Sequence, residues 1–257
     1  MVGPIFIKQL LFNKPQDFYC SFSTLFKIKL MKHIKHIFFD LDHTLWDFET
    51  NSDIAFETIF KKHKVKVDLQ KFLNYYRGIN EHYWKLYREE KVTKEEMRIG
   101  RLKDTFVKIN EKVGMQLLEN LSVDYIKVLP HHNQLFEGTH EILEHLSMNY
   151  KLHIITNGFN EVQYKKIENS GIAKYFDKII TSEDAGVKKP NPIIFEYALE
   201  ITKAVCAESI MIGDNWEADI MGAKEAGFDV IFCNFNSAPV SENIKSVTNL
   251  IEIKHYL

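Results

Sequence analysis

The sequence predicts an α/β fold in which a parallel sheet is flanked by helices and one all-helical module is inserted after the first strand. From Lys151 onward, short apolar runs alternate with amphipathic stretches, a pattern typical of crossover units on a parallel sheet. From about Ser52 to Val128, the chain is instead rich in Lys, Glu, Tyr and Leu, contains no Pro and shows no strand signal. The inserted module would lie over the carboxyl ends of the strands, where open parallel sheets bind ligands.

Length and composition fit one large domain or a core with a smaller insert. The 257 residues are 45% hydrophobic and 13% aromatic, which is ample for a buried core. Lys and Arg total 33 against 35 Asp and Glu, so the chain has no overall field that would attract a nucleic acid polymer or an acidic membrane. A small anionic ligand needs only local positive charge and remains compatible with this balance.

The cysteines favour a reducing compartment. Cys20, Cys206 and Cys233 are widely spaced and form no CxxC pair, which argues against a disulfide scaffold or a zinc ribbon. No apolar run reaches the roughly 18 to 20 residues of a membrane span, and the N-terminal FIKQLLF is too short for a signal-peptide core. We therefore expect a cytoplasmic protein that binds no membrane, while the oligomeric state stays open.

Residues 1–30 are rich in Phe and Lys without a clear period, and Met31 directly precedes the first predicted strand. We interpret them as an N-terminal extension that is either disordered or translated from an upstream start codon.

The first predicted strand is the apolar stretch His36–Phe39, and the run DLDHTL follows it at Asp40 to Leu45. Asp40 and Asp42 would share a face of a regular strand, and a turn there would aim both carboxylates at one bound group. Two close carboxylates repel each other unless a cation lies between them, which favours a divalent metal with oxygen ligands. Asp and Thr after a strand are also common turn and capping residues, so this run alone leaves both readings open.

The second half of the chain divides into strands and helices with recognisable helix ends. Four strands are expected at the apolar runs LHIIT, KIIT, SIMIG and VIFC, with helices at 160–170, 191–203 and 217–226. Asn191 suits an N-cap with Pro192 at the first helical position. Gly171 and Gly227 suit the positions just after a helix.

Three further polar clusters fall where these strands should end: the segment Thr156–Gly158, the segment Lys188–Pro190, and the pair Asp214 and Asp219. Taken singly, they read as a tight turn, a solvated loop lysine and a helix cap. Together with DLDHTL, they place polar groups at four successive strand ends, as an active site on a parallel sheet requires.

These clusters resemble the four motifs of the haloacid dehalogenase superfamily. DLDHT is similar to its first motif, Thr156 to its second, Lys189 before Pro190 to its third and GDNWEAD to its fourth. The resemblance covers Lys35 to the C-terminus. It implies a Rossmann-like core at 31–50 and 129–257, with a helical cap of the first type at 51–128.

The resemblance also implies a role for each motif residue. Asp40 would attack phosphorus and form an aspartyl phosphate, and Asp42 would act first as general acid and then as general base. Thr156, Asn157 and Lys189 would hold the oxygens of the transferred phosphoryl group.

The metal expected from the resemblance is Mg²⁺. Its ligands would be the Asp40 carboxylate, the backbone carbonyl of Asp42 and Asp214, and Asp219 would orient water bound to the metal.

The acid at Asp42 favours phosphate esters over carbon–halogen bonds, because the dehalogenases of the superfamily lack an acid there. Three stretches resemble the pyrimidine 5′-nucleotidase branch, a house-cleaning type that acts on nucleoside monophosphates. They are DLDHTLWDF, the segment from IITNGF to FEYALE, and GDNWEADIMGAKEAG. The resemblance therefore implies a 5′-nucleotidase for pyrimidine nucleoside monophosphates.

Three alternatives stay open at this point. One is a phosphatase for sugar phosphates or other small metabolites. A second is phosphoryl transfer to another substrate, and a third is a non-catalytic phosphate-sensing or interaction protein with the same fold.

Substrate choice is expected to lie in the helical cap, where aromatic and polar residues cluster between Tyr75 and Tyr87. Aromatic rings would stack on a base and an amide would read its edge, although rings at helical spacing also serve helix packing. Asn80 and Trp84 lie four residues apart on one helix face and are our first candidates, with Tyr87 and Asn160 as further ones.

Overall fold

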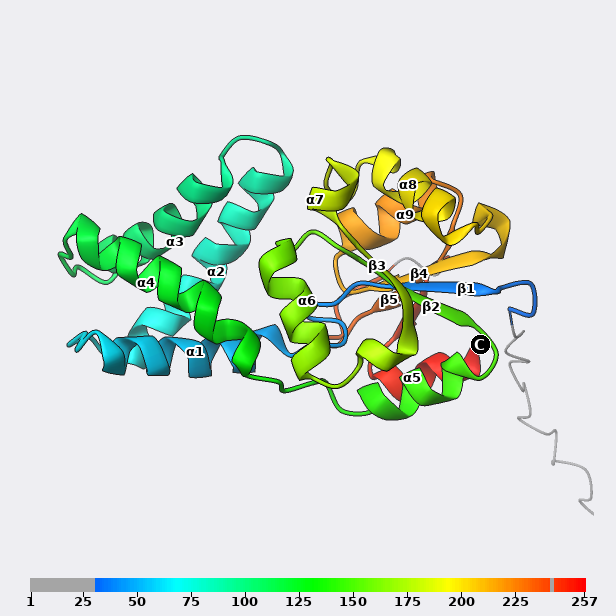
Figure 1. Ribbon diagram of the computed structural model, residues 1–257, viewed down its shortest axis with the longest axis horizontal. Helices are drawn as coiled ribbons and strands as arrows, with labels where there is room; N and C mark the ends of the chain where they lie inside the picture. Colours follow the sequence, from blue (N-terminus) through cyan, green and yellow to red (C-terminus); the bar gives the residue numbers. More distant parts are fainter. Residues whose placement is uncertain (1–30, 241–242) are drawn as a thin grey trace, which may run out of the picture.

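The computed structural model describes residues 31–240 and 243–257 (Figure 1). The predicted N-terminal extension, residues 1–30, lies outside the described residues. Within the described ranges, no helix combines the length and the apolar character needed to cross a membrane.

The described chain contains a six-stranded parallel sheet with the strand order β3-β2-β1-β4-β5-β6, which confirms the predicted α/β class. Its strands are β1 (His36–Phe39), β2 (Lys151–Thr156), β3 (Phe176–Thr181), β4 (Ser209–Gly213), β5 (Asp229–Cys233) and β6 (Lys245–Val247). All five predicted strands are present, whereas the edge strand β6 was not predicted. From β1, the chain adds β2 and β3 on one side and β4, β5 and β6 on the other. The crevice at the carboxyl end of β1 is therefore the expected ligand site.

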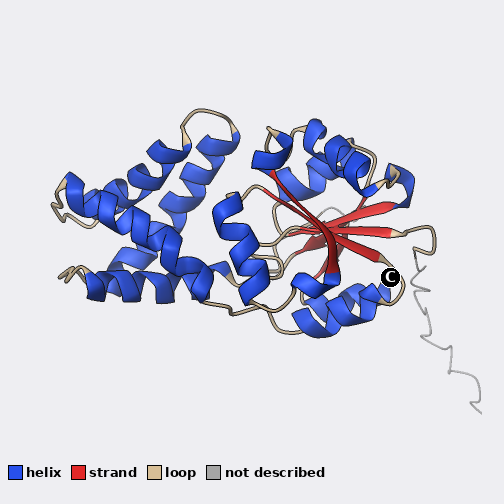
Figure 2. Ribbon diagram, viewed as in Figure 1, coloured by secondary structure: helices blue, strands red, loops and turns tan. Residues whose placement is uncertain are grey.

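Helices cover both faces of this sheet, and a group of four helices lies beyond one end of its strands (Figure 2). The four are α1 (Phe48–Lys62), α2 (Leu69–Arg88), α3 (Lys94–Lys108) and α4 (Met115–Val128). The others flanking the sheet include α5 (Thr139–Ser147), α6 (Asn160–Asn169), α7 (Ser182–Ala185), α8 (Pro192–Thr202) and α9 (Gly222–Glu225). The division into a core at 31–50 and 129–257 and a cap at 51–128 stays a prediction.

The sheet separates two apolar clusters because strand side chains alternate between its faces. Phe38 packs with residues of α8 and α9 on one face, whereas Phe39 packs with residues of α5 and α6 on the other. The second cluster continues into the four-helix group through Trp46 and Phe48. One continuous apolar cluster thus joins the four-helix group to the sheet.

Helices α1 to α4 are held together by buried aromatic rings. The ring of Phe56 lies 4.5 Å from that of Tyr76 and 5.1 Å from that of Phe72, measured between centroids. Side-chain caps fix where the helices begin, since Asp47 accepts from Thr50 and Asp68 accepts from Lys71. Much of the aromatic content of this segment therefore serves packing.

The predicted helix ends are largely confirmed. The side chain of Asn191 caps α8, Pro192 is its first residue, and Gly171 and Gly227 adopt φ angles of 72° and 87°.

One expected helix, 217–226, is corrected by the structure. It consists of a π-helix, η4 (Trp216–Met221), followed by the short α9. The wide turn forms because the backbone N–H groups of Asp219 and Ile220 both donate to the carbonyl of Asn215. Asp219 in turn accepts from the backbone N–H of Asn215 at 2.9 Å, which tucks its carboxylate beneath the end of β4. Such π-turns occur frequently at functional sites.

At the opposite end of the sheet, His153 of β2 is completely buried beside His36 of β1. The two rings are joined by a 3.0 Å hydrogen bond between Nε2 of His153 and Nδ1 of His36. Burial lowers the pKa of His153 to about 4, and the adjacent His36 adds to this effect. His153 is therefore neutral in the folded protein at neutral pH.

This histidine should make the fold sensitive to acid. Between the ordinary pKa of 6.5 and about 4, the unfolded chain binds a proton at His153 that the folded chain does not bind. We expect this group to lower the free energy of unfolding by about 3 kcal/mol as the pH falls through that window. Urea denaturation of wild type and His153→Leu from pH 7 to pH 4 measures the effect. The variant should lose less stability, whereas the exposed control His82→Gln should follow wild type, and equal slopes in all three would contradict the assignment.

Candidate active site

The carboxyl ends of β1, β2 and β4 bring the predicted polar clusters together. Because β1 lies between β2 and β4, Asp40 at its end has Thr156 on one side and Asp214 on the other. Lys189 enters from the loop between α7 and α8, and Asp219 enters from η4. Five parts of the chain therefore build one site.

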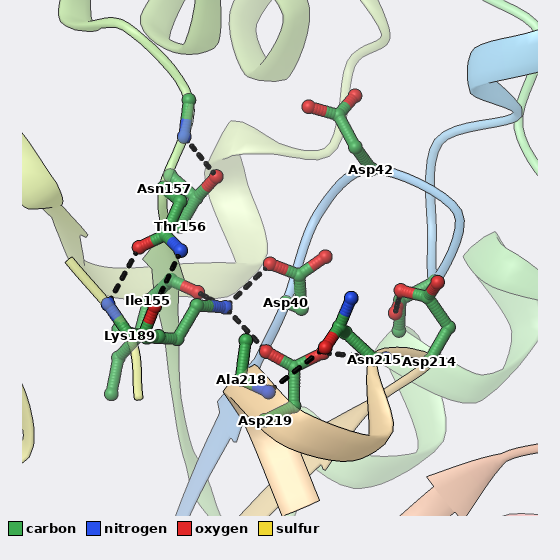
Figure 3. A network of polar contacts seen from close by, with 12 residues as sticks. Asp40, Asp42, Ile155, Thr156, Asn157, Lys189, Asp214, Asn215, Ala218 and Asp219 are labelled. Carbon is green, nitrogen blue, oxygen red and sulfur yellow. Dashed lines mark hydrogen bonds and ion pairs between the residues drawn. The ribbon is translucent and has the colours of Figure 1, made fainter. Parts of the chain in front are cut away.

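A buried ammonium lies at the centre of this site (Figure 3). Lys189 is 1% exposed, and its Nζ lies 2.6 Å from Asp40, 2.7 Å from Asp219 and 2.7 Å from the carbonyl of Ile155. Burial alone would lower the pKa of Lys189, but the adjacent carboxylates of Asp219 and Asp40 outweigh it and raise the pKa. Lys189 therefore stays charged.

Asn157 fixes the backbone that carries this lysine. Its side-chain oxygen accepts from the backbone N–H of Lys189 at 2.8 Å, and its side-chain nitrogen donates to the Lys189 carbonyl at 2.9 Å. The side chain of Asn157 therefore positions Lys189, and its predicted contact with phosphate stays a prediction.

Asp40, Asp214 and Asp219 form the carboxylate cluster, in which one oxygen from each residue lies within 4.8 Å of the others. Burial, followed by the charge of Asp219, raises the pKa of Asp214 to about 7. Burial likewise raises the pKa of Asp40 well above its usual range, although the charge of Lys189 opposes it. One ammonium cannot balance three carboxylates, and the donors are all oxygens. This set fits a hard divalent cation such as Mg²⁺.

The side chain of Asp42 lies apart from the Lys189 network (Figure 3). Its Oδ1 accepts from Nζ of Lys166 at 2.6 Å, and its Oδ2 accepts from Nε2 of Gln163 at 3.0 Å. Burial lowers the pKa of Lys166, with the charge of Asp42 opposing it. Both partners belong to α6.

Sequence reasoning did not identify Lys166 or Gln163. The sequence nevertheless contained a signal: at helical spacing, both residues fall on the same helix face as the apolar Val162 and Ile167, and this face of α6 is buried. A lysine at a core-facing helical position is uncommon unless it is paired.

Thr156 has a hydroxyl oriented by two donors. Its Oγ1 accepts from the backbone N–H of Gly158 at 3.1 Å and from Nε2 of Gln163 at 2.8 Å. A hydroxyl has two acceptor lone pairs and one proton, so the proton of Thr156 remains to be donated to a ligand oxygen.

A cavity of about 520 Å³ opens above these groups. It is bounded by Asp40, Asp42, Thr156, Lys189 and Asp214 at one end and by residues of α1 and α2 at the other. Two predicted specificity residues, Asn80 and Trp84, line it.

Tyr87 is not among the described residues that line this cavity. Its ring contacts Phe159 at 5.7 Å, and Phe159 also stacks on Trp84 at 5.5 Å. The cations of Lys94 and Arg98 lie over the same phenyl ring at 4.3 and 4.4 Å. Tyr87 thus helps to join the helical insert to the loop after β2.

Asn160 is likewise absent from the described cavity lining. Its side chain hydrogen-bonds with the hydroxyl of Thr181 and with the carboxylate of Asp184. These contacts anchor the start of α6 to the end of β3.

Asn80 presents its amide in a defined orientation. The side-chain oxygen accepts from Nη1 of Arg101 at 2.8 Å and from the hydroxyl of Tyr76 at 3.4 Å. Because the oxygen is engaged by these donors and Asn80 lines the cavity, its amide N–H groups are the part of the side chain available to a ligand. The site therefore offers a donor at this point.

Comparison with known proteins agrees with this geometry. The model of the family described as haloacid dehalogenase-like hydrolase matches residues 37–233. The pyrimidine 5′-nucleotidase PynA of Streptococcus pneumoniae is 33% identical, with 78% of this chain and 84% of PynA covered. The pyrimidine 5′-nucleotidase YjjG of Escherichia coli is 30% identical, with 86% of this chain and 96% of YjjG covered.

The crystal structure of YfnB from Bacillus subtilis bound to magnesium superposes with a TM-score of 0.78 at 27% identity. The superposition covers 86% of this chain and 97% of YfnB. With its sheet, its four motifs and these similarities taken together, the chain belongs to the haloacid dehalogenase-like hydrolase family.

Proposed function

We propose that this protein is a Mg²⁺-dependent phosphomonoesterase that hydrolyses pyrimidine nucleoside 5′-monophosphates. The observation that carries the proposal is the cluster of Asp40, Lys189, Asp214 and Asp219 at one end of a cavity whose other end is lined by α2. A fixed cation and a site for a divalent metal suit a phosphate group. The cavity leaves room beyond the phosphate for the rest of a small ester.

In the first step, an oxygen of Asp40 attacks phosphorus and the bond from phosphorus to the ester oxygen breaks. The leaving oxygen takes a proton from Asp42, and the phosphoryl group remains on Asp40 as an aspartyl phosphate. In the second step, water gives a proton to Asp42 as its oxygen attacks phosphorus. The bond to Asp40 then breaks, which releases inorganic phosphate.

Two groups of the site would bind the transferred phosphoryl oxygens. Lys189 supplies a buried positive charge, and Thr156 supplies the hydroxyl proton that its two donors leave free. These groups offset the repulsion between the phosphate and the attacking carboxylate of Asp40.

The metal would be held by the carboxylates of Asp40 and Asp214 and by the backbone carbonyl of Asp42, with Asp219 beside it. When bound, Mg²⁺ would neutralise charge on the phosphate. Thr44 supports this role for Asp214, since its hydroxyl donates to the Asp214 carboxylate at 3.1 Å.

The far end of the cavity supports a nucleoside as the leaving group. The ring of Trp84 offers a surface for stacking, and the amide of Asn80 offers donors to an oxo group such as those of uracil or thymine. The similarity to PynA and YjjG, which are both pyrimidine 5′-nucleotidases, favours the same substrate class. A phosphatase for sugar phosphates or other small metabolites would use the same phosphate end without these two contacts.

Loss of the nucleophile should abolish turnover. Asp40→Asn removes the attacking oxygen anion, and we expect hydrolysis of p-nitrophenyl phosphate with Mg²⁺ to fall by at least about 10³-fold. The matched control Asp229→Asn, at the start of β5 and the opposite end of the sheet, should retain activity. Hydrolysis by Asp40→Asn within tenfold of wild type would exclude Asp40 as the nucleophile.

The nucleotide preference can be tested with a panel of esters. We expect kcat/KM for UMP, dUMP and dTMP to exceed that for purine nucleotides and sugar phosphates by at least about tenfold. Asn80→Leu should lower kcat/KM for UMP by roughly 10- to 100-fold, because a buried donor contact is worth about 1–3 kcal/mol. The exposed Asn74→Leu on the same helix serves as control. Equal rates on all esters would favour the metabolite phosphatase.

Metal binding has a readout that does not depend on turnover. A cation that binds only the folded state raises its stability, so millimolar Mg²⁺ should raise the Tm of wild type by several degrees. Asp214→Asn should reduce this rise strongly, whereas the exposed neighbour Glu217→Gln should keep it. A Tm of wild type that does not respond to Mg²⁺ would contradict the metal site.

A further inference from the structure

Lys166 and Gln163 donate to the two carboxyl oxygens of Asp42, and Gly158 leaves the space that Gln163 occupies. We propose that these three residues, the Asp42 clamp, position Asp42 for proton transfer to the leaving oxygen. The inference rests on the proposed phosphomonoesterase function. Lys166 acts here as a positioning residue that works through Asp42, and Gln163 as one that works through both Asp42 and Thr156.

Lys166 is fixed in place by its surroundings. Its side chain is 2% exposed, and its Nζ lies 4.1 Å from the ring centroid of Trp46 and 5.3 Å from that of Phe48. Among the described residues, Asp42 is the one carboxylate within 4.0 Å of this nitrogen. A buried ammonium without an acceptor for its protons is costly, so the 2.6 Å contact with Asp42 holds both side chains in one geometry.

Gln163 connects Asp42 to the phosphate end of the site. Its Nε2 donates to Oδ2 of Asp42 and to Oγ1 of Thr156, at 3.0 and 2.8 Å. The amide of Gln163 therefore sets the distance between the proposed proton donor, Asp42, and the proposed phosphate ligand, Thr156. A change in the position of Gln163 would move both.

Gly158 makes room for this amide. A β-carbon on Gly158 would overlap the side-chain amide of Gln163, so no larger residue fits there unless Gln163 moves. Gly158 also donates its backbone N–H to Thr156. The turn after β2 is thus shaped around the clamp.

The clamp matters because Asp42 lies on a loop rather than on a strand or helix. A free aspartate there would sample several rotamers, whereas donors on both oxygens fix its side-chain torsions. Misplacement of a catalytic group by about 1 Å can cost 10²-fold in rate. A lysine that only tied α6 to this loop would instead affect all substrates equally.

The test compares two leaving groups. An alkyl ester, UMP or ribose 5-phosphate, whichever wild type hydrolyses faster, needs a proton on its leaving oxygen, whereas p-nitrophenolate leaves without one. For Lys166→Met with Mg²⁺, we expect kcat/KM for the alkyl ester to fall about 100-fold and that for p-nitrophenyl phosphate to fall less than tenfold. The ratio kcat/KM is the appropriate measure because it reports the steps up to departure of the leaving group.

Three further variants make the result decisive. Lys166→Arg keeps a charged donor and should restore the ratio of the two kcat/KM values to within about threefold of wild type. Lys165→Met, at the exposed neighbouring position on α6, should leave both values unchanged. If Lys166→Met does not fold, Gly158→Ala displaces Gln163 without unpairing a buried charge. Because Gln163 also donates to Thr156, this variant should lower both kcat/KM values, but the value for the alkyl ester should fall more.

Equal losses on both esters, or no loss on either, would overturn the clamp while leaving the proposed phosphomonoesterase intact. A wild-type protein that hydrolyses neither ester would overturn both proposals.

Discussion

The ion pairs of the buried Lys189 are the interaction on which the rest of the site depends. The carboxylates of Asp40 and Asp219 could not both be buried as anions at this sheet edge without a nearby cation. Lys189 supplies that charge, and its loop is held in turn by Asn157 after β2. The lysine thereby fixes the ends of β1 and β2, the loop before α8 and the π-turn η4 relative to one another.

Much of this arrangement could be predicted because it follows from topology. In a parallel sheet, the carboxyl ends of neighbouring strands meet at one edge, so the order of polar clusters along the chain is enough to bring Asp40, Thr156 and Asp214 together. The strands themselves were visible as apolar runs, and Asn191 and Gly171 marked helix ends through local backbone chemistry. These features depend on few long-range details.

The features that were missed depend on tertiary hydrogen bonds. The π-turn at Asp219 arises because two backbone N–H groups donate to the carbonyl of Asn215. No residue pattern in 217–226 indicates this sharing. The pairing of Lys166 with Asp42 requires the rotation of α6 about its axis, and hydropathy indicates that rotation only coarsely. Tyr87 and Asn160 also carry groups suited to ligand binding. In the folded protein, however, the ring of Tyr87 packs against Phe159, and the amide of Asn160 hydrogen-bonds with Thr181 and Asp184.

The central place of β1 in the sheet has a consequence for synthesis of the chain. This strand pairs with β2 and β4, in the register of His36 with Lys151 and with Ser209. The ribosome completes all four helices α1 to α4 before either partner strand exists. These helices bury their aromatic residues mainly among themselves, and such local contacts form fast. The nascent chain can therefore form the helices that line one end of the cavity before it forms the sheet that carries the carboxylate cluster.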